Sequence, residues 1–331
     1  MMKKLLKIVS FSVLCILGTT RVNAQIDPHF SQYYANPLWL NPGLTGVIDG
    51  DYRVTLNAKQ QWSSISNSYL TAGASFDVAP TKNLAFGGMV LNQSAGDVNY
   101  NYLNALASAA YRIRFGRAGA NIVNFGIQAG ILNKSFDPTK ITTGSQFGGG
   151  GFDSGLPNNE TFSSSNTLVP DVNAGVMYFD GSPDKQANVF FGVSGNHLTR
   201  PTDHFLGNDV LIPIRFTGHG GVRVKVSDVL DITPNGLYMK QGTAKEISGG
   251  AYAQYFVNQD TDLLFGANYR HEDAAIAYFG MHIKNMSFGV SYDFNTSNLN
   301  RATGSKGGLE LSVSFTSRKG ITGPNFFCPR L

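Results

Sequence analysis

Apolar and polar residues alternate one by one through most of this chain, and this period of two limits its fold more than any other feature. In residues 287–294 the even positions are Phe, Val, Tyr and Phe, while the odd positions are Ser, Gly, Ser and Asp. After a polar connection, residues 309–315 continue with Leu, Leu, Val and Phe, separated by Glu and two Ser. Successive side chains of a strand point to opposite faces, so each run predicts a strand with one apolar face.

A soluble β-sandwich shows the same alternation, so the pattern by itself leaves both folds open. The pattern recurs across nearly the whole chain, which also starts with an export signal and is rich in Gly, Asn and Ser. No apolar run of helix length follows residue 24, and a chain that crosses lipid without helices must close a sheet on itself. We therefore expect an all-β protein, a transmembrane antiparallel up-and-down β-barrel with apolar side chains toward lipid and polar ones in the lumen.

Residues 1–24 are typical of a secretory signal peptide. They begin with Lys3, Lys4 and Lys7, continue with an apolar run over residues 8–17, and end in Val-Asn-Ala, which predicts cleavage between Ala24 and Gln25. The apolar run is much shorter than the ~20 residues that a helical membrane span needs. The protein is therefore expected to leave the cytoplasm.

Charge and cysteine content exclude several classes of function for the remaining chain. Four of the 26 basic residues and none of the 22 acidic ones lie in the signal, so the rest carries 22 of each and is formally neutral. A neutral chain gives no reason to expect a nucleic-acid partner. Cys328 is the one cysteine after residue 24, so no internal disulfide is expected.

Turn residues divide residues 51–316 into about fourteen alternating runs, an even number as in bacterial outer-membrane barrels. Most runs have the ~9–11 residues that a tilted strand needs to cross the membrane. The predicted strands are residues 52–60, 68–78, 84–93, 100–114, 120–132, 167–179, 187–195, 212–225, 229–240, 245–256, 262–270, 274–284, 286–294 and 307–316.

The connections between these strands predict an orientation. If both termini are periplasmic, short turns and long loops alternate, and outer-membrane barrels carry their long loops outside. The expected outer loops include residues 133–166 and 196–211, and the expected inner turns include residues 79–83, 116–119, 180–184 and 258–260. Arg53, Lys59, Arg223 and Lys225 are placed in the lumen, because each cation facing lipid at mid-depth would cost ~2–4 kcal/mol.

Residues 25–50 precede the first strand and differ from the rest. Pro28, Pro37 and Pro42 rule out a long helix or a central strand, yet large aromatic and apolar side chains indicate that the segment packs on something. We expect four parts: the signal peptide over residues 1–24, a periplasmic or plug-like segment over 25–50, the barrel over 51–316, and a C-terminal periplasmic tail over 317–331.

Both ends of the chain carry a resemblance to a known family. Asp27-Pro28-x-Phe30-Ser31-Gln32-Tyr33 and the later Asn41-Pro42-Gly43 closely resemble the start of mature PorP/SprF-family proteins, which belong to the type IX secretion and gliding machinery of Bacteroidetes. The end of the chain resembles the Cys-Pro-Arg of that family, which is normally followed by an aromatic residue; Leu331 departs from it. Further matches to the opening pattern are Arg53-Val54, Gln61-Trp62, Tyr69, Thr71, Ser75 and Asp77.

The resemblance implies a non-enzymatic outer-membrane component that exports large secreted proteins or anchors them at the cell surface. Implied partners are adhesins with a type B C-terminal domain, periplasmic and lipoprotein parts of the apparatus, and outer-membrane lipid. We hypothesise that the matching residues and Trp62 dock these partners. They are Asp27, Pro28, Phe30, Ser31, Gln32, Tyr33, Asn41, Pro42, Gly46, Trp62, Cys328, Pro329 and Arg330.

Two other functions stay open from the sequence: an outer-membrane channel for small or hydrophobic solutes, and a soluble periplasmic β-protein. No catalytic residue, cofactor or metal site is predicted. The Gly-rich residues 148–155 lack the Gly-Lys-Ser/Thr of a phosphate loop, and residues 180–184 lack the distal Glu of a calcium loop. The histidines are scattered and show no metal-ligand spacing.

Overall fold

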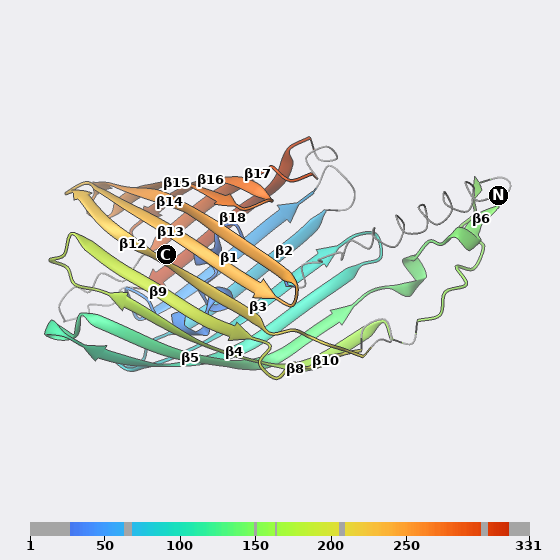
Figure 1. Cartoon of the computed structure of the whole chain (residues 1–331), viewed down its shortest axis with the longest axis horizontal. Coiled ribbons are helices and arrows are strands. Elements are labelled where there is room, and N and C mark those ends of the chain that lie inside the picture. The colour runs from blue at the N-terminus through green and yellow to red at the C-terminus, as the bar shows by residue number, and fades with distance from the viewer. Residues whose placement is uncertain are drawn as a thin grey trace, which may run out of the picture.

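The computed structural model describes residues 27–62, 68–148, 151–162, 164–204, 209–298 and 304–317. Within these ranges, fourteen strands form a closed barrel in which each strand pairs antiparallel with its neighbours along the chain (Figure 1). The first and last wall strands, β1 and β18, close the cylinder, with Tyr52 opposite Ser317 and Gln61 opposite Gly308. The predicted up-and-down β-barrel is confirmed.

The elements follow one another in a simple order. Short helices are η1 (Tyr33–Ala35), α2 (Pro37–Leu40), η2 (Pro42–Leu44), η3 (Arg117–Gly119), η4 (Pro138–Lys140) and η5 (Gly144–Gln146). Two small hairpins outside the wall pair β6 (Phe147–Gly148) with β7 (Gly151–Phe152), and β10 (Thr202–Asp203) with β11 (Val210–Leu211). The wall strands are β1 (Tyr52–Gln61), β2 (Tyr69–Val78), β3 (Leu84–Ala95), β4 (Tyr100–Phe115), β5 (Asn121–Ser135), β8 (Asn166–Asp180), β9 (Ala187–Asn196), β12 (Arg215–Ser227), β13 (Leu230–Gln241), β14 (Ala244–Asn258), β15 (Thr261–Arg270), β16 (Ala274–Ile283), β17 (Met286–Asn295) and β18 (Lys306–Ser317).

All fourteen predicted runs are wall strands, with boundaries that differ by no more than three residues. β12 begins at Arg215 instead of residue 212, because Pro213 has no N–H to donate to the ladder. The Ile212 N–H instead donates to the Pro201 carbonyl at 3.0 Å, outside the wall. β5 extends to Ser135 because its last residues pair with β8.

The wall has apolar side chains outside and polar ones inside, the reverse of a soluble domain. On β1, Leu56 is 53% exposed while Lys59 is fully buried. Cations predicted to face the lumen form ion pairs there, Arg53 with Asp77, Lys59 with Asp293 and Arg223 with Asp231. Lys225 instead pairs with Asp228 beside the turn that follows β12. Among the described residues, every helix is too short or too polar to cross a membrane.

The two ends of the barrel differ in their connections. The long connections, residues 136–165 and 197–214, lie at one end, which we call the long-loop rim. The opposite end, the short-turn rim, carries the connections 79–83, 116–120, 181–186 and 259–260. Figure 1 shows β6 of the longest connection far beyond the wall strands. The predicted sorting of loop lengths is present in the structure.

Candidate functional site

Residues 27–50, here called the inner segment, run through the lumen from one rim toward the other. Asp27 contacts His197, which directly follows the end of β9 at the long-loop rim. At the other end, Asp51 donates its N–H to the Ser317 carbonyl at the short-turn rim. Most side chains of the inner segment are buried, and Figure 1 shows the segment in blue inside the wall.

Proline and asparagine shape the inner segment into short turns instead of a long helix. Pro37 and Pro42 occupy the first positions of α2 and η2, where the missing N–H needs no partner. The Asn41 side chain caps η2 by accepting from the Gly43 N–H at 2.8 Å, which ends α2 and redirects the chain. The result is a compact segment that presents backbone and side-chain groups on all sides to the wall.

A buried ionic cluster joins the start of the inner segment to the wall. Asp27 lies 2.9 Å from both His197 Nε2 and Arg215 Nη1, and His197 Nδ1 lies 2.9 Å from Asp171 of β8. Burial opposes the imidazolium, but Asp27 and Asp171 raise the pKa of His197 to about 9. Burial likewise opposes the carboxylate, yet His197 and Arg215 hold the pKa of Asp27 well below its usual range. Both groups are therefore charged at neutral pH.

A second polar cluster holds the next residues against β17 and β18. Glu310 accepts from the Ser31 N–H at 2.6 Å and from the Gln32 N–H at 3.2 Å. The Ser31 hydroxyl donates to Asp293 at 2.7 Å and accepts from Lys59 at 2.8 Å. These charge-assisted bonds are buried, where loss of one partner is costly.

Aromatic residues of the segment pack inside the barrel. Trp39 donates its indole N–H to the Pro28 carbonyl at 3.1 Å, and the guanidinium of Arg215 lies 4.1 Å from the centre of the Trp39 ring. Tyr33 donates its hydroxyl to Asn235 of β13 at 2.5 Å. Phe30, 3% exposed, belongs to an apolar cluster with residues of β3 and β4.

The later part of the inner segment lies in close backbone contact with the wall. A Cβ at Gly126 of β5 would lie 2.0 Å from the Pro42 carbonyl oxygen, so only glycine leaves room for this approach. Gly46, at φ +70°, donates its N–H to Asp77 at 2.8 Å, and its carbonyl accepts from Arg112. Asn41 donates to the Val176 carbonyl at 3.1 Å. Both backbone and side-chain contacts therefore hold the inner segment against this part of the wall.

The structure brings together many of the residues singled out from the sequence. The lumenal ones are Asp27, Pro28, Phe30, Ser31, Gln32, Tyr33, Asn41, Pro42 and Gly46. Trp62 lies apart from them at the long-loop rim, where it packs edge-on against Tyr69 at 5.0 Å between ring centroids. Ala24, Gln25, Cys328, Pro329 and Arg330 lie outside the described residues.

Sequence reasoning missed the wall residues that hold this segment. His197 was interpreted as one of several scattered histidines, although it is 1% exposed and contacts two carboxylates. Arg215, Arg270 and Glu310 stand at inward positions of their strands. A charged residue at an inward position of a strand was the sequence signal that could have identified these contacts with the inner segment. Within the described ranges, no group of three or more His, Cys, Asp and Glu is arranged to hold a metal ion.

Comparisons with solved structures agree with the geometry. The chain is similar to the toluene transporter TbuX of Ralstonia pickettii, with a TM-score of 0.53, 11% identity, and 86% of this chain and 93% of that chain covered. It is also similar to the TodX deltaS2S3 mutant monoaromatic hydrocarbon channel, with a TM-score of 0.50, 10% identity, and coverage of 85% and 94%. At such identity the likeness shows the fold alone.

The closed wall, its apolar outer face and these neighbours define an outer-membrane β-barrel protein. No curated protein sequence matches the chain. The family model "Type IX secretion system membrane protein PorP/SprF" matches residues 22–315. The chain therefore belongs to the PorP/SprF family, and the resemblance drawn from its opening motif is confirmed.

Proposed function

We propose that the protein is a non-enzymatic component of type IX secretion that is needed to export large secreted proteins or to hold them at the cell surface. The passengers are adhesins with a type B C-terminal domain. Family membership carries the secretion role. Residues 27–50 fill the lumen, so a folded or extended passenger has no free path through the barrel. This supports a protein that binds and positions the passenger instead of conducting it through the lumen.

The orientation we propose places the long-loop rim outside the cell and the short-turn rim in the periplasm. Long loops on one rim are typical of the outer face of such barrels. Gly50, where the inner segment meets β1, and Ser317, where β18 ends, both lie at the short-turn rim. Ser317 at the end of β18 then faces the periplasm, where lipoprotein and periplasmic parts of the apparatus are the partners, and Asp27 at the start of the inner segment lies at the outer rim.

The passenger would dock on the connection over residues 136–165. Its small hairpin exposes Phe147 and Phe152, 63% and 48% exposed, with ring centroids 5.4 Å apart. Leu156 beside them is 41% exposed. Exposed aromatic side chains that project from a surface are typical anchors for a partner protein.

A tagged pull-down from detergent-solubilised outer membrane tests this function. We expect one large secreted passenger and apparatus components to co-purify with the tagged protein. A variant that lacks residues 144–156 provides the control, because it should keep the periplasmic components and lose the passenger. Recovery of the native protein with neither class of partner would contradict the proposal.

A channel for small or hydrophobic solutes is the second candidate, and one observation favours it. A cavity remains between the inner segment and the wall, and it reaches Lys284 and Thr316 at the short-turn rim. A stable single-channel conductance of the native protein in planar bilayers, together with an empty pull-down, would support the channel over the secretion role.

A further inference from the structure

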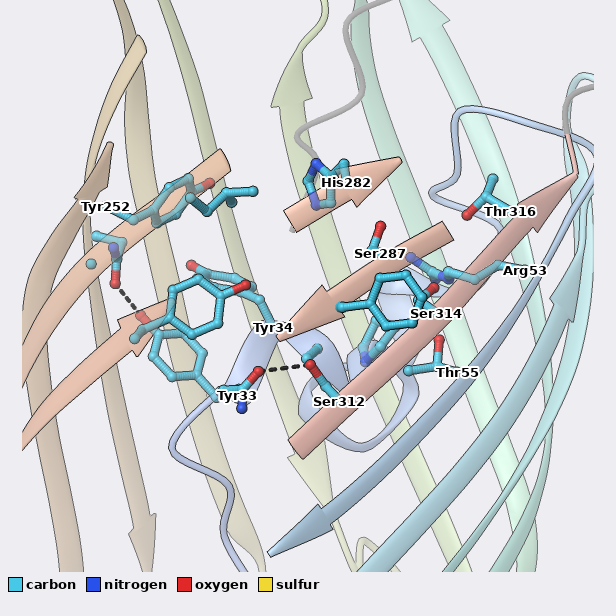
Figure 2. A pocket seen from close by; sticks show the side chains of 18 of the residues that line it. Tyr33, Tyr34, Arg53, Thr55, Tyr252, His282, Ser287, Ser312, Ser314 and Thr316 are labelled. Carbon is cyan, nitrogen blue, oxygen red and sulfur yellow. Dashed lines mark hydrogen bonds between the residues drawn. The ribbon is translucent and has the colours of Figure 1, made fainter. Parts of the chain in front are cut away.

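A cavity of about 160 Å³ lies inside the barrel between the inner segment and the wall strands β1 and β13 to β18 (Figure 2). It is far larger than the ~10–15 Å³ that one water molecule needs. Residues 31–35 and 47–49 of the inner segment form one side, and wall residues as far as Thr316 form the other. The ionic cluster around Asp27 lies elsewhere, so this cavity is a separate feature of the lumen.

Aromatic rings line one part of the cavity. Tyr33 and Tyr34 come from the inner segment, with ring centroids 4.4 Å apart, and Tyr252 and Tyr278 come from β14 and β16. Burial raises the pKa of Tyr34, which stays a neutral phenol. The face of an aromatic ring is electron-rich and attracts C–H groups, so these rings suit a flat ligand with apolar faces.

Hydroxyl groups from neighbouring strands form a row along the opposite part. Ser314 of β18 is paired in register with Thr55 of β1 on one side and with Ser287 of β17 on the other. Ser287 is in turn paired with His282 of β16. All four line the cavity, and Figure 2 shows their side chains around it. The row therefore offers hydrogen-bond donors and acceptors across four adjacent strands.

The charges around the cavity are balanced. Arg53 makes two hydrogen bonds to Asp77, at 2.9 and 3.0 Å, and His282 lies 2.6 Å from Asp262. Asp49 and Lys284 add one charge of each sign. Thr55 is 2% exposed, and its hydroxyl has no hydrogen-bond partner within the described part of the chain. A buried hydroxyl without a partner destabilises the fold, and a hydrogen bond from a ligand hydroxyl would relieve that cost.

We propose that this cavity binds a neutral carbohydrate, whose sugar rings stack on Tyr33 and Tyr34 while ring hydroxyls bond to Thr55, Ser314 and Ser287. A hydrocarbon would leave the hydroxyl row without partners, and a charged ligand would compete with ion pairs that already exist. Sugar rings of the same chemistry occur in cell-wall glycan strands and in glycans attached to secreted proteins or lipids. The site goes beyond the secretion role and does not depend on it.

Calorimetric titration of the full-length protein in a sugar-free zwitterionic detergent tests the proposal. The probes are an N-acetylglucosamine trimer, maltotriose and toluene. We expect at least one oligosaccharide to bind, with preference for the amino-sugar trimer indicating a cell-wall source and preference for maltotriose indicating another glycan. Absence of oligosaccharide binding at millimolar concentration would overturn the proposal, whether or not toluene binds.

Paired variants separate a binding role from general stabilisation of the barrel. Thr55→Val should weaken oligosaccharide binding at least tenfold because it removes a hydroxyl that bonds the ligand, and Tyr34→Leu should do so because it removes a ring on which a sugar stacks. Thr167→Val removes another buried hydroxyl without a partner in the described chain, and Tyr111→Leu removes an outward-facing ring; both residues lie outside the cavity, so both variants serve as controls. Equal affinity of Thr55→Val and Thr167→Val would overturn the proposal. Ser314→Ala replaces Thr55→Val if the latter does not fold.

Discussion

His197 Nε2 lies 2.9 Å from Asp27 Oδ2, while His197 Nδ1 lies 2.9 Å from Asp171 Oδ1. One imidazole therefore joins the inner segment to wall strand β8. Both ring nitrogens face carboxylates, an arrangement that favours the doubly protonated ring. This ion bridge links the position of the inner segment to the protonation state of one side chain.

The bridge predicts that high pH weakens the docking of the inner segment. The pKa of His197, about 9 in the folded protein, lies above the 6.5 of a free histidine. The contribution of His197 to stability is therefore fully present below about pH 6.5 and is lost as the pH rises through about 9. We expect amide hydrogen exchange of residues 27–32 to accelerate between pH 7 and 10 more than the intrinsic chemistry requires.

The variant His197→Asn is the control for this pH dependence. It should lower the free energy of unfolding by roughly 3–5 kcal/mol at pH 7, because buried Asp171 loses its cation and Asp27 keeps only Arg215. It should also remove the extra acceleration of exchange above pH 8. An equal acceleration in the variant and the native protein would show that another group titrates.

A close backbone approach gives the second prediction. A Cβ at Gly126 would lie 2.0 Å from the Pro42 carbonyl oxygen, whereas a Cβ at Gly218 has nothing within 4 Å. We expect Gly126→Ala to destabilise the protein by about 1–3 kcal/mol through overpacking. Gly218→Ala should leave the unfolding midpoint in urea nearly unchanged. Similar unfolding midpoints for the two variants would mean that the inner segment moves away from the added methyl group without loss of stability.

The fold follows from local pattern, because alternation and turn residues mark each strand within its own ten to sixteen residues. The candidate site does not. Ser31 and Glu310, joined by a 2.6 Å hydrogen bond, are 279 residues apart in sequence, and Asp27 and His197 are 170 apart. Sequence indicates that residues 25–50 must pack and that charged inward positions need partners. The sequence does not show which residue of the segment contacts which charged wall residue, because those contacts depend on how the segment lies within the closed wall.

The packed lumen gives the third prediction, which concerns conductance. Deletion of residues 27–50 would remove apolar contacts such as those of Tyr33 and Leu38, and would leave a lumen lined by polar side chains. We expect a larger single-channel conductance for this deletion than for the native protein in planar bilayers. Deletion of residues 144–156 serves as the control, since it shortens an outer connection without touching the lumen. Unchanged conductance in both would show that another segment closes the barrel.

The projecting hairpin gives the fourth prediction, which tests the proposed docking of the passenger. Phe147 and Phe152 contact each other and are largely exposed, so Phe147→Ser together with Phe152→Ser should change the stability by at most about 0.5 kcal/mol. Loss of the two apolar anchors should reduce the surface-bound passenger several-fold in intact cells, measured by labelling with an antibody. An unchanged amount of surface-bound passenger would show that this hairpin is not part of the docking surface.

The last prediction concerns the outer face of the wall. Leu311 lies near the middle of β18, is 52% exposed, and stands between Ala58 of β1 and Val290 of β17 in the register of the sheet. If this face contacts hydrocarbon, Leu311→Arg should make folding into lipid vesicles less favourable by about 2–4 kcal/mol, because a cation at mid-depth loses its hydration. Leu156→Arg, at 41% exposure on the projecting connection, places the same charge in water and should have little effect. Equal stability of the two variants would mean that the apolar face of β18 is covered by something other than lipid, since water alone would not account for so many exposed apolar side chains on one surface.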